Sequence, residues 1–268
     1  MLQTAIKVFN TLKNTVQKVY HILHLEKHET KKGRKEIIHP IDAITLFLFK
    51  QKQNIETKKS LFEIMELPCS YKTLVVSLNR IAPLLAKIIA VMLAMNGKSA
   101  HWLKHTDSTD IPVSLVKNAK HHKTMLGLAA WSKTGKGWFY GLKLHLSSDV
   151  KGRVLALCIT SGNSNDRAIF KKMNEKLRGI FVADAGYISK ELERDFFIEN
   201  ERMLFTIPRS KMRKLVTAFQ YACMQTRMKI EIHFRVLKMF FGLVTSLPRS
   251  IDGYLTHYLA STCSYLLA

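Results

Sequence analysis

The hydrophobic pattern of this chain changes near residue 100, and that change constrains its fold more than any other feature. Over residues 5–23 the apolar side chains recur at steps of three and four, the period of an amphipathic helix. Over residues 138–160 two apolar runs flank a polar turn instead, which is typical of a β-hairpin. The sequence therefore predicts an all-helical region over residues 1–100, followed by an α/β domain over residues 101–268.

Further short helices are predicted in the N-terminal region at 41–52, at 59–66 and after an N-cap at Ser70. Three such helices in succession are compatible with a helix-turn-helix that binds DNA. They are equally compatible with a helical bundle that only packs on the rest of the chain. A later segment, 84–95, is apolar nearly all round and is predicted to be a buried helix.

The chain carries a large excess of positive charge, with 42 Lys and Arg against 20 Asp and Glu and a formal net charge of +22. Such an excess predicts a polyanionic partner, and nucleic acid is the first candidate because each neutralised phosphate releases counterions. By charge alone, an acidic membrane surface or an acidic protein fits equally well. No membrane span is expected, because the most apolar window, 81–95, is too short and contains Pro83 and Lys87.

The cysteines and the N-terminal segment indicate the compartment. The four cysteines are far apart and lack the paired spacing of zinc sites or disulfide frameworks, so they are predicted to be reduced thiols. Residues 1–23 alternate apolar and polar side chains at helical period, which is unlike an export signal. We expect a cytoplasmic protein.

The order of elements in the second part indicates its fold class. It is predicted to run strand, hairpin, helix, strand, helix, strand, helix, and this order is compatible with a ribonuclease-H-like mixed sheet flanked by helices. The hairpin turns at Asp149 to Gly152. The later helices and strands are predicted at 167–177, 179–183, 189–200, 203–207 and 222–241.

Two aspartates follow predicted strands in this part. Asp107 ends the strand that starts at His101, and Asp184 ends the apolar strand 179–183. Parallel neighbours would place both carboxylates at one sheet edge, where they would provide the oxygen ligands that Mg²⁺ requires. Asp110 is an alternative to Asp107, but Pro112 suggests that the strand has already ended there, so we favour Asp107.

A third carboxylate is expected from a helix packed across that edge. On the predicted helix 222–241, Arg227, Glu231 and Lys238 follow one another at steps of four and seven, so they share one face. An acid between two bases suits a metal ion together with a phosphate. The same pattern also occurs in an ordinary row of surface ion pairs.

Four segments together carry a family resemblance. HTDSTDIPV, FYGLKLHL, FVADAGYIS and RMKIEIHFRVLK are similar to successive blocks of bacterial insertion-sequence transposases of the DDE type, and the similarity runs from about residue 100 to the end. The resemblance implies that Asp107, Asp184 and Glu231 are catalytic metal ligands. In the Tyr-x2-Arg-x3-Glu-x6-Lys signature of that family, Arg227 and Lys238 take the Arg and Lys positions, with roles in contacting phosphate.

The family's function is then the expectation for this chain. A transposase would bind the terminal inverted repeats of a mobile element, cut DNA there with two Mg²⁺ ions (or Mn²⁺ in their place), and join the freed end to target DNA as a homo-oligomer. Met224 occupies the Tyr position of the signature, and Tyr221 lies about one turn earlier. The alternatives are therefore a weakened or inactive DNA-binding remnant, and a ribonuclease-H-like nuclease without strand transfer.

Other polar residues of this part have structural interpretations. Either Asn165 or Asp166 could cap the helix that follows, and for Asp166 a cap is favoured over a metal ligand. A lone strand histidine such as His145 is usually structural. Tyr187 either stacks on a base or covers the core. His121 and His122 are predicted to lie in a basic loop.

Overall fold

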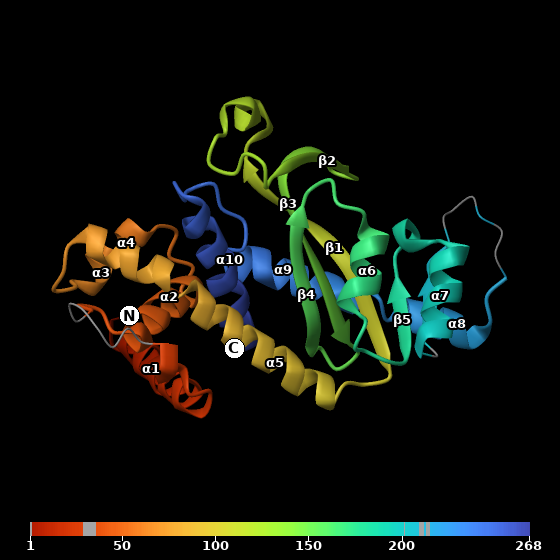
Figure 1. Cartoon of the computed structure of the whole chain (residues 1–268), viewed down its shortest axis with the longest axis horizontal. Helices are drawn as coiled ribbons and strands as arrows, with labels where there is room; N and C mark the ends of the chain where they lie inside the picture. The colour runs from red at the N-terminus through yellow and green to blue at the C-terminus, as the bar shows by residue number, and fades with distance from the viewer. Residues whose placement is uncertain (1, 29–35, 201, 209–211, 213–214) are drawn as a thin grey trace. The chain divides into compact units, whose positions relative to one another are not determined.

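The computed structural model describes residues 2–28, 36–200, 202–208, 212 and 215–268, and these form two compact units (Figure 1). The helical unit consists of residues 1–92 with 236–268, and the α/β unit of residues 93–235. Residues 236–268, which the sequence prediction grouped with the α/β domain, pack with the N-terminal helices. The assignment of DNA binding to the helical region and of catalysis to the α/β domain stays a prediction.

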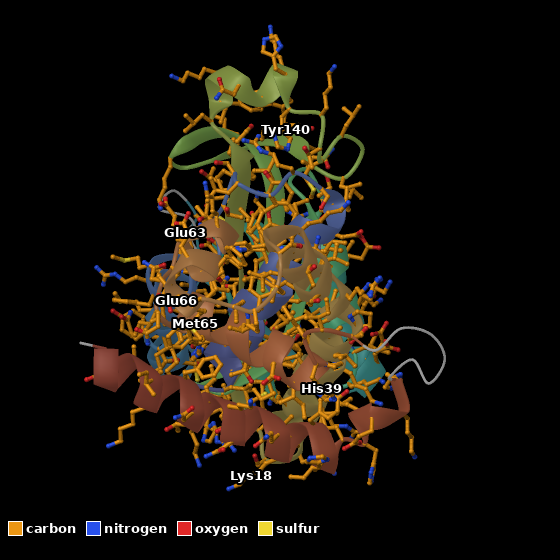
Figure 2. The ribbon with its side chains drawn as sticks, turned by 90° about the vertical axis from the view of Figure 1, so that its left-hand side faces the viewer. Lys18, His39, Glu63, Met65, Glu66 and Tyr140 are labelled. Atoms are coloured by element: carbon orange, nitrogen blue, oxygen red, sulfur yellow. The ribbon has the colours of Figure 1, made fainter. Side chains whose placement is uncertain are left out.

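The helical unit is built around α2 (Pro40–Lys52), whose side chains are almost all buried. On it pack α1 (Leu2–Ile22) and α10 (Ile251–Leu266). Along α1, Leu12, Val16 and Tyr20 are buried, whereas Lys18 projects from the opposite side of the helix (Figure 2). The remaining elements are η1 (Leu25–His28), α3 (Lys58–Met65), α4 (Tyr71–Arg80) and parts of α5 (Ala82–Lys98) and α9 (Met228–Phe240).

Side-chain caps determine where α3 and α4 begin. Thr57 Oγ1 accepts the backbone N–H of Ser60 at 2.8 Å, and Ser70 Oγ accepts that of Thr73 at 3.2 Å, so the predicted cap at Ser70 is confirmed. Glu66, next to Met65 at the end of α3 (Figure 2), ends that helix in a left-handed conformation with φ of 43°. Helix α3 lies within one residue of the predicted range 59–66, and α4 begins after Ser70 as predicted. Whether they contact DNA stays a prediction.

Helix α5 differs from the prediction of a helix buried all round. Among its side chains only Leu85, Ile88 and Ile89 are buried, and Met95 is 64% exposed. Together α4 and α5 form one described helical stretch, Tyr71–Lys98, that is long and apolar enough to be compared with a membrane span. A single stretch of this kind is weak support for a span, since core helices have the same composition.

The α/β unit contains a six-stranded mixed sheet (Figure 1). The central strand β1 pairs antiparallel with β3 and parallel with β5; β3 pairs antiparallel with β2 and β4, and β5 pairs parallel with β6. This is the predicted ribonuclease-H-like mixed sheet. The strands are β1 (Leu103–Ser114), β2 (Ala130–Thr134), β3 (Gly137–Asp149), β4 (Val154–Ser161), β5 (Ile180–Ala183) and β6 (Met203–Thr206).

Helices cover both faces of this sheet. On one face Phe181 packs with Phe170 of α6 (Asp166–Met173) and Phe196 of α7 (Lys190–Asn200). On the other face Val182 packs with Leu103 of β1 and with α8 (Ala218–Gln225). Because neighbouring residues of a strand point to opposite faces, this assignment also fixes the direction of the side chains beyond Val182.

The predicted β3–β4 hairpin is confirmed, and Asp149 holds its turn together. The Asp149 carboxylate is fully buried and accepts the backbone N–H groups of His101, Lys151 and Arg153, together with Nε of Arg153 at 3.0 Å. Burial opposes its charge, but these hydrogen bonds outweigh burial and hold the pKa of Asp149 below its usual value. The Asp149 carboxylate therefore binds both the hairpin turn and the segment just before β1.

We expect Asp149→Asn to lower the free energy of unfolding by about 2 kcal/mol or more, because an amide cannot accept from all of these donors. Urea denaturation at neutral pH measures the change. The matched control is Asp195→Asn, which alters a partly exposed ion pair with Lys171 and should cost less than about 1 kcal/mol. Equal losses in the two variants would contradict the anchoring role.

Candidate active site

Asp107 and Asp184 lie next to each other at one edge of the sheet. The parallel pairing of β1 with β5 ends where Thr106 lies opposite Ala183. Asp107 directly follows Thr106, and Asp184 directly follows Ala183. Asp107 Oδ1 accepts the N–H of Ser108 at 2.8 Å, and Asp184 Oδ1 accepts the N–H of Ala185 at 2.7 Å. In each carboxylate one oxygen is thus oriented by the backbone.

The prediction that β1 ends at Asp107, before Pro112, is wrong. The strand continues to Ser114, because β3 keeps pairing with it after β5 has ended, and Pro112 lies beside a register shift. Asp110 therefore lies within the strand, in register with Lys143. Since Asp110 is three residues after Asp107, the two side chains point to opposite faces, and Asp107 is on the face of α8.

The predicted helix 222–241 is broken into α8 and α9, and Arg227 lies at the break. Thr226 ends α8, and its hydroxyl donates to Cys223 O at 2.7 Å. The same hydroxyl accepts from Nε2 of the buried His105 of β1 at 2.7 Å. Burial lowers the pKa of His105 to about 4, so the ring is neutral and this hydrogen bond ties the break to the sheet.

Arg227 joins the acids at this edge. Its Nη2 donates to Asp107 Oδ2 at 2.5 Å, and its Nη1 donates to Glu231 Oε1 at 2.8 Å. Burial disfavours the charged guanidinium, but the charges of Asp107, Asp184 and Glu231 outweigh it and raise the pKa of Arg227. Arg227 therefore hydrogen-bonds to two carboxylates, those of Asp107 and Glu231, and the charge of Asp184 acts on it as well.

The charge at Asp107 is only partly balanced. Its side chain is 15% exposed, and burial raises its pKa to about 6; nearby Asp184 adds to the increase, while Arg227 and the amide of Ser108 offset part of it. Asp184 and Glu231 are exposed. The edge thus combines one half-buried carboxylate, that of Asp107, with two that are exposed.

The donor set fits a divalent metal ion by its chemistry, since all of its donor atoms are carboxylate oxygens. In the part of the chain that the structure describes, no three His, Cys, Asp or Glu side chains surround a common metal position. Asp107 and Glu231 are both engaged with Arg227 instead. A shared ion would require these two side chains to turn away from the guanidinium.

The two other positions of the predicted signature lie further along α8 and α9. Met224 is buried with Leu103 and Val182 in the apolar layer between α8 and the sheet, so its side chain fills the core. Tyr221, one turn earlier, is 57% exposed. Lys238 is half-buried in α9, seven residues after Glu231, in the part of that helix that belongs to the helical unit.

A second polar cluster, made by Lys143, His145, Asp166 and Tyr187, lies on the other side of β1. Of the two predicted candidates for the cap of α6, Asn165 is the cap, whereas Asp166 pairs with Lys143 at 3.0 Å. His145 is buried and its Nε2 bonds the Thr160 hydroxyl at 2.8 Å. Tyr187 packs in the core, as one of its two interpretations required; burial raises its pKa, and Asp107 and Asp166 add to the increase.

The sheet order and the carboxylates at the β1–β5 edge define the class of this unit as a ribonuclease-H-like domain of the DDE type. The model of the transposase DDE domain family matches residues 97–250, which is more than half of the chain. The chain therefore belongs to the family of DDE transposase domains. The family implies a polynucleotidyl transferase that takes part in DNA transposition and depends on divalent metal ions.

Two further comparisons add little. No curated protein matches the sequence. Among solved structures, the Mos1 strand transfer complex is similar with 12% sequence identity, covering 89% of this chain and 79% of that chain, at a TM-score of 0.24. A TM-score of this size supports no inference about fold or function.

The raised pKa of Asp107 predicts a pH-dependent stability in metal-free buffer. Its folded-state pKa of about 6 lies above the unfolded value, so its stabilising contribution is complete below about pH 4 and is lost as the pH rises through about 6. Over that interval the parent protein should lose on the order of 2–3 kcal/mol relative to Asp107→Asn, which cannot ionise. Urea denaturation at a series of pH values measures the difference, and parallel curves for the two proteins would contradict the shift.

Proposed function

We propose that this protein is a transposase that cuts DNA at the ends of a mobile element and joins the freed ends to target DNA, with Asp107, Asp184 and Glu231 holding two Mg²⁺ ions. Mn²⁺ would serve in their place. The observation that carries the proposal is that Arg227 hydrogen-bonds to Asp107 and Glu231 at the edge of the sheet where Asp184 follows the strand paired with that of Asp107. Membership of the family of DDE transposase domains supports the same assignment.

When bound, the metal ions would activate the attacking water or 3′-hydroxyl and stabilise the leaving oxygen. The protein's own residues position the carboxylates and balance their negative charge. The backbone amides of Ser108 and Ala185 each fix one oxygen of Asp107 and Asp184. The other oxygen of Asp107 accepts from Arg227, and a bound ion would take the place of that guanidinium. Arg227 donates through Nη1 to Glu231 and through Nη2 to Asp107. Once these carboxylates turn to a metal ion, the same two N–H donors could bind a phosphate group in a bidentate contact.

DNA is the partner that the charge of the chain favours, with the element's terminal inverted repeats and the target duplex as its two forms. The net charge of +22 gives a strong, salt-dependent attraction to any duplex. The helical region is the proposed site for end binding, and Lys238 a point contact to phosphate. Joining two ends to one target requires at least two active sites, so a homo-oligomer assembled on DNA in the cytoplasm is proposed.

The alternative of an inactive remnant rests on Met224. That side chain fills the core between α8 and the sheet, while the three acids and Arg227 remain in place without a tyrosine there. The geometry therefore favours an active enzyme. A nuclease without strand transfer would use the same acids, so only the joining of a pre-cut end to a second duplex separates it from a transposase.

We expect Asp184→Ala to lower Mg²⁺-dependent cleavage and strand transfer on an element-end duplex by at least about a hundredfold, the scale of losing one polar group from an active site. DNA binding measured in EDTA should remain within about twofold, since Asp184 contributes no positive charge. Gel assays of nicked and joined products, alongside a filter-binding assay, measure both quantities.

The matched control is Asp110→Asn, on the same strand as Asp107 but on its opposite face, which should keep cleavage near the parental rate. Parent protein that binds DNA but shows no cleavage with Mg²⁺ or Mn²⁺ would favour the inactive remnant. Cleavage without joining would favour the nuclease.

A further inference from the structure

The helical unit contains a cavity of about 320 Å³ whose lining includes four basic side chains. Its walls come from the end of α2, the start of α3, α4, the segment 245–250 and the start of α10. The basic side chains that line it are Lys50, Lys58, Arg249 and His257. Glu56 also lines it, but this side chain is exposed.

The two lysines are held there by neutral partners only. Lys50 is 2% exposed, and its ammonium donates to the side-chain oxygen of Gln51 at 3.1 Å. Lys58 donates to Asn79 Oδ1 at 2.6 Å and lies over the ring of Phe47. Among the described residues neither lysine forms an ion pair with a carboxylate. Lys50 is buried and Lys58 is half-buried. Positive charges withdrawn from water without a carboxylate paired to them are costly, so this arrangement favours an anion.

Burial and the neighbouring charges shift the pKa values of the titratable groups in the cavity. Burial, together with the charge of Lys58, lowers the pKa of Lys50 to about 8, while the charge of Glu56 opposes this decrease. Burial alone lowers the pKa of Lys58 to about 8. His257 is neutral, because burial lowers its pKa to about 3, and its Nε2 donates to Gly242 O at 2.6 Å.

The rim of the cavity suits a nucleotide chain. Ser250 and Gly253 at the start of α10 line the cavity, and the positive end of a helix dipole favours an anion. Tyr71 and Leu247, each 43% exposed, supply apolar surface beside the cations. A free phosphate ion gains nothing from contact with apolar side chains, whereas the sugar and base next to a backbone phosphate can pack on them.

We propose that this cavity binds a phosphate group through Lys50 and Lys58, with the phosphate supplied by the backbone of a DNA strand. The choice of DNA as its source rests on the proposed function; the phosphate site itself does not. A free phosphate would satisfy the same lysines, and the experiments below distinguish the two sources.

The first experiment measures thermal unfolding in EDTA with inorganic phosphate, against chloride at equal ionic strength. We expect phosphate to raise the Tm of the parent protein by about 2–5 °C, and this rise to be lost in Lys50→Met and in Lys58→Met. In chloride both variants should be at least as stable as the parent, because each removes a positive charge that is largely withdrawn from water and has no carboxylate paired to it. Lys59→Met is the matched control, since Lys59 is exposed beside Lys58 and does not line the cavity.

The pH dependence gives a second readout of the same site. Both lysines lose their charge as the pH rises through about 8, so the phosphate-specific rise in Tm should be largest near pH 7 and small at about pH 9. The other charged or titratable groups that line the cavity are Glu56, Tyr71, Arg249 and His257. Of these, His257 is already neutral throughout that interval.

The second experiment measures the affinity for a short duplex in EDTA over a range of salt. With DNA as the source, Lys58→Met should weaken binding at least about fivefold more than Lys59→Met. A phosphate-specific rise in Tm without this difference would assign the site to a free phosphate. These metal-free readouts are independent of cleavage, so a protein without transposase activity can still have the site.

Three results would overturn the proposal. One is a parent Tm that is equal in phosphate and chloride, together with equal duplex affinities for Lys58→Met and Lys59→Met. Another is a phosphate-specific rise that both cavity variants retain, since phosphate would then bind elsewhere. The third is a loss of stability in both variants in chloride with the phosphate effect intact, which would make the lysines structural donors to Gln51 and Asn79.

Discussion

The guanidinium of Arg227 provides the positive charge that allows Asp107, Asp184 and Glu231 to lie at one edge of the sheet. Neighbouring carboxylates repel one another, and the half-buried Asp107 has a pKa that burial raises to about 6 even with Arg227 beside it. The break between α8 and α9 places Arg227 there, and the His105–Thr226 hydrogen bond holds that break against β1. The site therefore depends on a helix end as much as on the strands.

The side-chain period of two along a strand made much of this arrangement predictable. A short apolar strand followed by an acid, as in 180–184, identifies a residue at the edge of a sheet, and the position of Asp184 next to Asp107 needs only parallel pairing of two such strands. The spacing of Arg227 and Glu231 also brings them into contact, although Arg227 precedes the helix. Their convergence follows from local rules combined with one strand pairing.

The remainder depends on tertiary contacts that no local pattern contains. Strand β1 continues past Pro112 because β3 supplies a pairing partner, and the helix predicted over 222–241 is interrupted because Thr226 bonds to a histidine 121 residues earlier in the chain. The buried Lys50 belongs to an otherwise apolar helix, in which a lysine near the C-terminus is expected to be solvated. Helix α10, about 200 residues later in the chain, packs on α2, and no local pattern around Lys50 indicates that contact.

Each unit of this protein thus holds charge that its own side chains do not fully balance, with opposite sign in the two cases. In the α/β unit the excess is negative and solvent-accessible at Asp184 and Glu231. In the helical unit it is positive and lies in a cavity with Lys50 and Lys58. A ligand that binds only the folded state adds to its stability, so a cation in the first unit and an anion in the second would each relieve a cost already present in the free protein. A protein that acts on a polyanion with the help of divalent cations gains stability from both at the moment it binds them, and its free form is correspondingly less stable.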